Sequence, residues 1–435
     1  MTEDDRPRVS GRARWGIPQG QYARRYALAA LVNSLGSGMF YPFMLLFFTE
    51  RLGLPLVSAG AVLTFAALVS AACVSFTSRA LDRFGARNVI IVLAITRALL
   101  FPVYLAINNV WLFALVATAV AIADRTDMVA GQVIVSELAE EKERPAWFAL
   151  SRMTLNAGLG AGALLGGALL ALTGQYALIV VANAVSFLLV ALLYLPIPSR
   201  RRQSRPGSAE QGADGPSMAI WRDRLMVCFA TVNGLWILAG LAIEIGLPVY
   251  LVVTLGLPEW TISLVFLVNT LLVTLLQLPV SARVARHPAV RMFGYGLVAY
   301  AITFAMLALS PGLDGAGAVV FVVVAVCVFT AGEMITSVTG MVVVTELAPP
   351  HRLGGYVGLQ HTFLGVGSAM APLVYSAGLA WSPQGLWSLL AVLMAVLAAA
   401  SILMRSHMAA RASASGPVVA ATPGNLNPPD PMARG

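Results

Sequence analysis

Twelve continuous apolar segments of membrane-spanning length constrain this chain more than any other feature. They run over 26–48, 56–78, 88–107, 110–136, 147–172, 176–196, 225–252, 259–281, 289–309, 316–346, 354–380 and 384–404. A helix needs roughly 20 apolar residues to cross a hydrocarbon core of about 30 Å. Only helices and closed barrels satisfy their backbone groups in lipid, and continuous apolar runs favour helices over alternating strands. We therefore predict an all-α membrane protein with twelve transmembrane helices.

The low content of charged residues supports a membrane protein, and the sequence patterns argue against two other classes of protein. Only 11% of the 435 residues are charged, whereas soluble domains carry about 25%. The net charge of +8 lies in short runs between apolar segments, without a pattern typical of nucleic-acid binding. A membrane-embedded enzyme would need a metal cluster, a nucleophile with its base or a phosphate loop. We find none of these motifs, and we expect no enzyme activity and no cofactor.

The arginines predict the orientation of the chain. The segments on the side of the N-terminus hold nearly all of them, including Arg24, Arg83 and Arg352, whereas the opposite loops hold only Arg51. Basic residues are retained on the cytoplasmic side of a membrane. We expect both termini in the cytoplasm and a location in the cell membrane, most simply the inner membrane of a bacterium.

Short repeated motifs divide the chain into two related halves. Val32-Asn33-Ser34-Leu35 resembles Val232-Asn233-Gly234-Leu235, Leu52-Gly53-Leu54-Pro55 recurs at Leu255-Gly256-Leu257-Pro258, and Val135-Ser136-Glu137-Leu138-Ala139 is echoed by Val344-Thr345-Glu346-Leu347-Ala348. Internal repeats in this order are typical of transporters built from two related bundles. We predict a cytoplasmic tail (1–25), a six-helix bundle (26–196), a cytoplasmic linker (197–224), a second, pseudo-symmetric six-helix bundle (225–404) and a disordered tail (405–435).

Several charged residues lie deep inside apolar segments. Asp124, Arg125 and Asp127 fall within 110–136, and the repeat places Glu333 opposite Asp124. A charge at this depth costs at least about 2.5–3.5 kcal/mol, so such residues normally face a cavity or a partner. A low-dielectric cavity also favours the protonated form of a carboxylate. We predict proton coupling by Asp124, Asp127 and Glu333.

Two arginines are the expected charge partners of these acids. Arg97, counted along its helix, reaches the depth of Asp124, and Arg125 is close to Asp127 in sequence. Ion pairs between Arg97 and Asp124, or between Arg125 and Asp127, would alternatively serve only to hold helices together.

A substrate cavity is expected between the two halves. The residues predicted to line it are Asn33, Asn233, Glu244 and Gln360. Four buried acids against two arginines favour a cationic or neutral lipophilic substrate over an organic anion.

The loop between the second and third segments resembles a known signature. Ser78 to Arg87 is similar to G-x-L-A-D-R-x-G-R-K of the major facilitator superfamily, with Asp82, Arg83, Gly85 and Arg87 at matching positions and Ser78 and Ala86 departing from it. The resemblance implies that this loop governs the conformational switch of a rocker-switch transporter.

The fifth segment carries a glycine pattern with two interpretations. Gly158, Gly162, Gly166 and Gly167 are spaced as small residues that let another helix approach closely. The pattern also resembles the fifth-span signature of the superfamily's antiporters, with Ala163 in place of its proline.

Together, these resemblances imply a drug:proton antiporter that exports small lipophilic or cationic compounds, uses the proton gradient as its energy source and acts as a monomer. A facilitator or proton symporter that imports a sugar-like or other small metabolite is the alternative.

Overall fold

The computed structural model describes residues 22–73, 80–81, 83–139, 143–198, 218–313, 315–349 and 352–414. Within these ranges every regular element is a helix. Most of the N-terminal tail, most of the linker, loop residue Asp82 and the chain after Ala414 lie outside the described residues.

The helices follow the predicted spans closely. The first half comprises α1 (Ala23–Phe40), η2 (Tyr41–Phe43), α2 (Met44–Leu52), α3 (Leu56–Ala72), α5 (Ala86–Val103), α6 (Val110–Leu138), α7 (Arg144–Thr173) and α8 (Tyr176–Tyr194). The second half comprises α9 (Met218–Trp221), α10 (Arg224–Gly240), η3 (Ala242–Gly246), α11 (Leu247–Val249), η4 (Tyr250–Thr254), α12 (Trp260–Val284), α13 (Ala289–Leu309), α14 (Gly315–Leu347), α15 (Leu353–Trp381) and α16 (Pro383–Ala414). The first span is α1–η2–α2 and the seventh is α10–η3–α11–η4, so each is one helix interrupted near its middle.

The described helices confirm the predicted fold class. Ten of them, counting interrupted helices once, are long and apolar enough to cross a membrane. The described part of α3 is a shorter apolar helix of 17 residues. Helix α6 has 29 residues, but Asp124, Arg125 and Asp127 lie inside it. With α3 and α6 the chain has the twelve helices of an all-α membrane protein.

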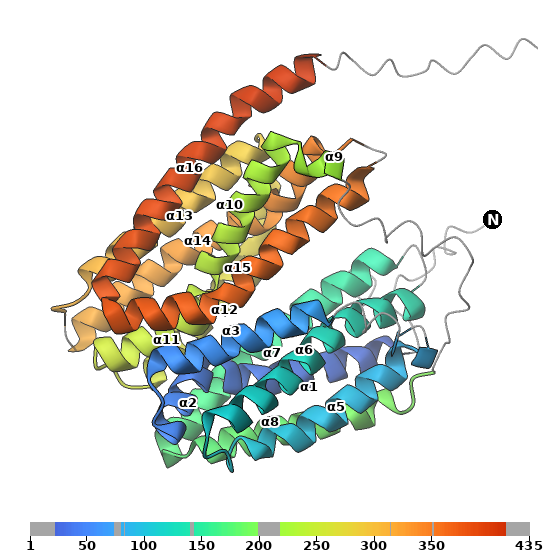
Figure 1. Ribbon diagram of the computed structural model, residues 1–435, viewed down its shortest axis with the longest axis vertical. Coiled ribbons are helices and arrows are strands. Elements are labelled where there is room, and N and C mark those ends of the chain that lie inside the picture. The colour runs from blue at the N-terminus through green and yellow to red at the C-terminus, as the bar shows by residue number, and fades with distance from the viewer. Residues whose placement is uncertain are drawn as a thin grey trace, which may run out of the picture.

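Figure 1 shows the two bundles lying side by side, with α1 to α8 in one and α10 to α16 in the other. In the first bundle α1 packs on α7 and α8, and α6 packs on α3 and α5. In the second, α13 packs on α14 and α16, and α10 packs on α15. The bundles meet along two helix pairs, α3 with α15 and α7 with α12.

Helix α16 is longer than predicted. We expected the last span to end at 404 and a disordered tail to begin at 405, but α16 continues to Ala414. Residues 405–414 are rich in alanine and arginine, which have high helix propensity, so the helix continues beyond the apolar segment. This part of the expected tail is therefore helical.

The glycines of α7 allow close helix packing. A Cβ atom at Gly158 would lie 2.5 Å from Cβ of Ser34, and one at Gly166 would lie 2.6 Å from the carbonyl oxygen of Met39. Gly162 likewise faces the backbone of α1, whereas Gly167 faces Ser263 of the second bundle. The glycine stripe thus serves the α1–α7 contact and, at Gly167, the contact between bundles.

The two ends of the molecule differ in how the bundles meet. We call the end that carries residues 53–55, 174–175 and 255–259 the hairpin end, and the end that carries α9 the linker end. Three hydrogen bonds that join the bundles lie toward the hairpin end: Thr64 Oγ1 accepts from the backbone N–H of Leu373 at 3.1 Å, Ser263 donates to the Ala163 carbonyl at 2.8 Å, and Tyr176 donates to Glu259 at 3.3 Å. The bundles are therefore tied together at the hairpin end.

Candidate functional site

A cavity of about 340 Å³ lies between the two bundles, and we call it the central cavity. It is lined by Asn33, Ser34, Ser37, Gly38, Tyr41, Pro42, Arg97, Asp124, Asp127, Met128, Leu155, Leu159, Glu244 and Phe266. These residues come from α1, η2, α5, α6 and α7 of the first bundle and from η3 and α12 of the second. A cavity lined by both bundles can change its access when the bundles move relative to each other.

Arg97 holds two carboxylates at the wall of this cavity. Its Nη1 atom lies 3.1 Å from Oδ1 of Asp124, and its Nη2 atom lies 3.0 Å from Oδ2 of Asp127. The side chain of Arg97 is only 2% exposed, and its guanidinium lies 4.3 Å from the centre of the Phe187 ring. Packing on a ring face fixes the guanidinium, since a cation is attracted to the electron-rich face. The predicted proximity of Arg97 and Asp124 is therefore present, and Asp127 joins the same arginine.

Neutral side chains of the first span complete this charged cluster. The Tyr41 hydroxyl donates to Oδ2 of Asp124 at 2.7 Å, and Nδ2 of Asn33 donates to Oδ2 of Asp127 at 3.4 Å. Tyr41 was not among the predicted site residues. It lies in η2, where Pro42 interrupts the first span, and a proline inside an apolar span is the feature that could have drawn attention to it.

Glu244 adds a third carboxylate from the opposite bundle. It lines the central cavity and is exposed to it, within η3, a π-helical turn. Turns of this kind are frequent at functional sites because they interrupt the regular helix and redirect side chains. Applying the offset from Leu52 to Leu255 to Tyr41 gives Glu244, and η2 contacts η3. The two spans thus meet at the cavity where each is interrupted, with Tyr41 on one side and Glu244 on the other.

Glu333 lies in α14, close to Glu244 but bound differently from the first-bundle acids. Its Oε2 atom accepts a hydrogen bond from Nδ2 of Asn269 at 2.8 Å, and the same amide donates to Thr330 at 3.0 Å. Glu333 and Arg152 are both near enough to Glu244 to interact with it electrostatically. Four acidic side chains from the two bundles therefore gather around the bundle interface.

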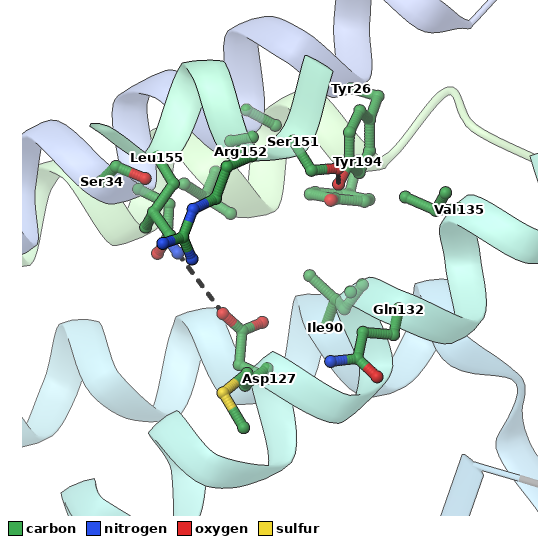
Figure 2. A pocket seen from close by; sticks show the side chains of 16 residues that line it. Tyr26, Ser34, Ile90, Asp127, Gln132, Val135, Ser151, Arg152, Leu155 and Tyr194 are labelled. Carbon is green, nitrogen blue, oxygen red and sulfur yellow. Dashed lines mark hydrogen bonds between the residues drawn. The ribbon is translucent and has the colours of Figure 1, made fainter. Parts of the chain in front are cut away.

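A second cavity of about 400 Å³ adjoins the central one toward the linker end, and we call it the linker-end cavity. It shares Asn33, Asp127 and Leu155 with the central cavity. In Figure 2 the side chains of Arg152 and Asp127 project into it from α7 and α6, and the dashed line is the Asn33–Asp127 hydrogen bond. Asp127 is thus reached from both cavities.

Three predicted site residues lie elsewhere. Arg125 makes no ion pair with Asp127, because Asp127 faces Arg97 on the other side of α6. Asn233 is fully buried, donating to the Phe229 carbonyl at 3.2 Å and accepting from Gln360 at 3.4 Å. Neither Asn233 nor Gln360 lines the central or the linker-end cavity. This amide pair instead joins α10 to α15.

The predicted switch loop is described only in part, since Asp82 lies outside the described residues. Gly85 has φ of +79°, a value that favours glycine. Arg87 donates from Nε to the Tyr194 carbonyl at 3.2 Å and also to the Leu195 carbonyl, and Arg83 is exposed. Arg87 therefore ties the start of α5 to the end of α8.

In the part of the chain that the structure describes, no group of three or more histidine, cysteine or acidic side chains is arranged to hold a metal ion.

Comparison with known proteins gives relatives of one kind. The chain is 23% identical over 365 residues to a Na⁺, Li⁺, K⁺/H⁺ antiporter of Planococcus maritimus, covering 77% of this chain and 84% of the relative. Among solved structures it is similar to the nucleoside transporter NupG, with a TM-score of 0.70 and 14% identity over 88% of this chain and 99% of the other. A POT family transporter in complex with a thioalcohol-conjugated peptide gives a TM-score of 0.72 and 12% identity over 91% of this chain and 99% of the other.

These structural similarities extend over almost the whole of the compared chains, and at such low identity they establish the fold alone. The sequence profile of the Major Facilitator Superfamily matches residues 26–372, which begin with the first predicted span and end within α15. This chain therefore belongs to the major facilitator superfamily of membrane transporters.

Proposed function

We propose that this transporter exchanges protons for small cationic compounds and exports them from the cell. The observation that carries the proposal is the charge of the central cavity: its described lining holds three acids, Asp124, Asp127 and Glu244, and one basic residue, Arg97. With all three carboxylates ionised, this wall is negative overall. A cation entering a cavity of low dielectric is then attracted strongly, whereas an anion is repelled.

The same carboxylates offer a route to proton exchange. Protonation removes the negative charge that attracts the cation, so a proton and a cation compete for one site. In this mechanism a bound proton weakens cation binding, and a bound cation disfavours proton binding by the same amount, because coupling between two ligands is reciprocal. Asp127 is the best placed for this role, since it lines both the central and the linker-end cavity.

The way the bundles meet fits alternating access. Hydrogen bonds tie the bundles at the hairpin end, and the linker-end cavity extends from the central cavity toward the other end. If the arginine-rich linker end is cytoplasmic, as the distribution of basic residues predicts, a cation from the cytoplasm reaches Asp127 in this conformation. Export then follows when the bundles rock about the central cavity.

One relative supports the type of exchange but does not identify the cation that this chain transports. The similar protein of Planococcus maritimus is named as an antiporter of alkali cations and protons. An apolar lining that includes Met128, Leu155 and Phe266 suits an organic cation with apolar groups as well as a bare ion. We therefore include both kinds of cation in the test.

The test uses purified protein reconstituted in liposomes. Their interior is acidic relative to the outside and contains a pH-sensitive dye. Adding Na⁺ or tetraphenylphosphonium outside should drive protons out, so the interior becomes more alkaline. We expect Asp127→Asn to slow this response at least tenfold for each cation that the wild type transports. The matched control is Glu346→Gln, which removes an exposed carboxylate near the linker end of α14.

Two results would contradict the proposal. Normal proton release by the Asp127→Asn protein would exclude Asp127 as the coupling group. Uptake of an uncharged sugar or similar metabolite, without any cation-induced change in the dye signal, would instead support the facilitator or symporter alternative.

A further inference from the structure

Arg125 lies near the middle of α6, yet the structure gives it no ion pair. None of the described acidic side chains lies within 4.0 Å of its guanidinium. The two ion pairs of the nearby cluster are both made by Arg97. An arginine at membrane depth is costly unless a partner or water compensates its charge. Arg125 is partly exposed and lines a cavity, from which a compensating group can reach it.

That cavity is a third one, of about 340 Å³, which we call the aromatic pocket. It lies among α1, η2, α3, α5 and α6, with Pro372 of the second bundle at its edge. Phe40, Phe101 and Tyr104 form one wall, with the rings of Phe40 and Phe101 5.1 Å apart and those of Phe101 and Tyr104 5.4 Å apart. Alanines of α3 and α6 line much of the rest. The size and the apolar lining are typical of sites for small organic ligands.

Most of the other polar groups of this pocket are already bound to the protein. Asp124 also lines the pocket, but its Oδ1 accepts from Arg97 and its Oδ2 accepts from the Tyr41 hydroxyl, so both of its oxygens have partners. The Ser70 hydroxyl donates to the Ala67 carbonyl at 2.8 Å. Among the described residues that line the pocket, Arg125 is therefore the charged group that remains available to a ligand, and the Tyr104 hydroxyl is a neutral group beside it.

We propose that the aromatic pocket binds an amphiphilic anion, such as a fatty carboxylate, with the anionic group on Arg125 and the apolar chain against the aromatic wall. The planar guanidinium presents paired N–H donors that match a carboxylate in a bidentate geometry. Burial of an apolar chain contributes further affinity in proportion to the area removed from water. The pocket adjoins the central cavity and shares Tyr41, Asp124 and Met128 with it, but its proposed ligand has the opposite charge to the cation proposed there.

The position of Arg125 also couples such a ligand to the arrangement of the bundles. Its Nη2 atom lies 3.7 Å from the position that a Cβ atom would take on Gly365 of α15. An anion bound to this guanidinium therefore lies beside both bundles. Its affinity depends on their relative position, so the anion favours the conformation described here over one in which α6 and α15 separate.

The proposal is tested with two ligands that share a tail and differ in charge, octanoate and octylammonium. Purified full-length protein in a neutral detergent is titrated with each, and the shift of the thermal unfolding temperature gives the affinity. We expect octanoate to stabilise the wild type and to bind Arg125→Gln at least tenfold more weakly, while Arg125→Lys retains part of the affinity. Arg152→Gln, which removes another arginine that faces a cavity without an ion pair, should bind octanoate as the wild type does.

A second variant tests the pocket without altering any charge. Ala121→Leu places a larger side chain into the aromatic pocket, and we expect it to weaken octanoate binding although Arg125 is intact. Octanoate affinity within twofold of the wild type in both Arg125→Gln and Ala121→Leu would overturn the proposal. The proposal would also be overturned if Arg152→Gln alone lost octanoate binding. The same holds if octylammonium stabilised the wild type as strongly as octanoate does and Arg125→Gln abolished this stabilisation. Cation-driven proton release is measured separately, so failure of the antiport proposal is distinguishable from failure of this one.

Discussion

The acidic sites of the two bundles occupy related positions but compensate their charge in different ways. In the first bundle Asp124 and Asp127 share Arg97, with both ion pairs near 3 Å. In the second bundle Glu333 accepts a hydrogen bond from the neutral amide of Asn269 at 2.8 Å, and no described basic residue forms an ion pair with it. Protonating Asp124 or Asp127 therefore breaks an ion pair, whereas protonating Glu333 does not.

This difference separates two tasks that a proton-coupled transporter combines. A buried arginine with two carboxylates holds α5 and α6 together and resists rearrangement, since separating buried charges is costly. A carboxylate held by an amide can change its charge while the amide keeps a hydrogen bond, because the protonated form still offers an acceptor oxygen. We infer that the first site contributes more to stability, and that Glu333 adds to the pH dependence of the proton exchange proposed for Asp127, because its protonation breaks no ion pair.

The largest effect is expected from removing the shared arginine. Arg97→Gln leaves Asp124 and Asp127 beside each other without their cation, and breaking a buried ion pair in this way costs about 3–5 kcal/mol. We expect the free energy of unfolding to fall by that amount, measured by denaturant titration in mixed micelles. The double variant Arg97→Gln with Asp127→Asn should recover part of the loss, because one of the two unpaired charges is gone. A loss below about 1 kcal/mol for Arg97→Gln, within the range of exposed pairs, would mean that this cluster is not the main support of the first bundle.

An intermediate effect is expected at Tyr41, which binds one acid of the same cluster. Tyr41→Phe removes the 2.7 Å hydrogen bond to Asp124 and keeps the ring. Hydrogen bonds to charged groups contribute about 1.5–3 kcal/mol, so we expect a loss of that size in the same titration. The matched control is Tyr295→Phe, because Tyr295 is an exposed tyrosine of α13. Equal losses in the two variants would show that the bond to Asp124 has no particular importance.

Much of the first-bundle site could be predicted from the sequence. Apolar runs located the spans to within a few residues, and helical rise placed Arg97 at the depth of Asp124, where the ion pair is found. The arginine's second partner was missed, because depth along a helix does not say which carboxylate a long side chain selects. Tyr41 was missed because a tyrosine in an apolar span resembles a packing residue, and only the neighbouring Pro42, which interrupts the span, sets it apart in the sequence.

Less of the second-bundle site could be predicted from the sequence, and the reason is geometric. Asn233 repeats Asn33 in sequence, yet Asn33 faces Asp127 while Asn233 is buried against Gln360. Similar depth does not ensure a similar face, because the faces that two helices present to the bundle interface depend on their rotation and packing. The π-helical turn at Glu244 adds a local change of rotation that hydropathy cannot reveal. Sequence repeats therefore predict reliably which helices of the two halves correspond. They predict less reliably which side chains line the same cavity.

The smallest effect on stability, and the sharpest test of the comparison, is expected at Glu333. Glu333→Gln keeps an acceptor for Asn269 and replaces a charged hydrogen bond by a neutral one, so the free energy of unfolding should fall by only about 1 kcal/mol.

The main effect of Glu333→Gln should lie instead in the pH dependence of cation binding. Cation binding by the wild type is expected to weaken as pH falls, because protonated carboxylates no longer attract the cation. Glu333→Gln removes one titrating group near Glu244, and the affinity for tetraphenylphosphonium should then vary less steeply with pH. An unchanged pH profile together with a stability loss as large as that of Arg97→Gln would reverse the roles that we assign to the two bundles.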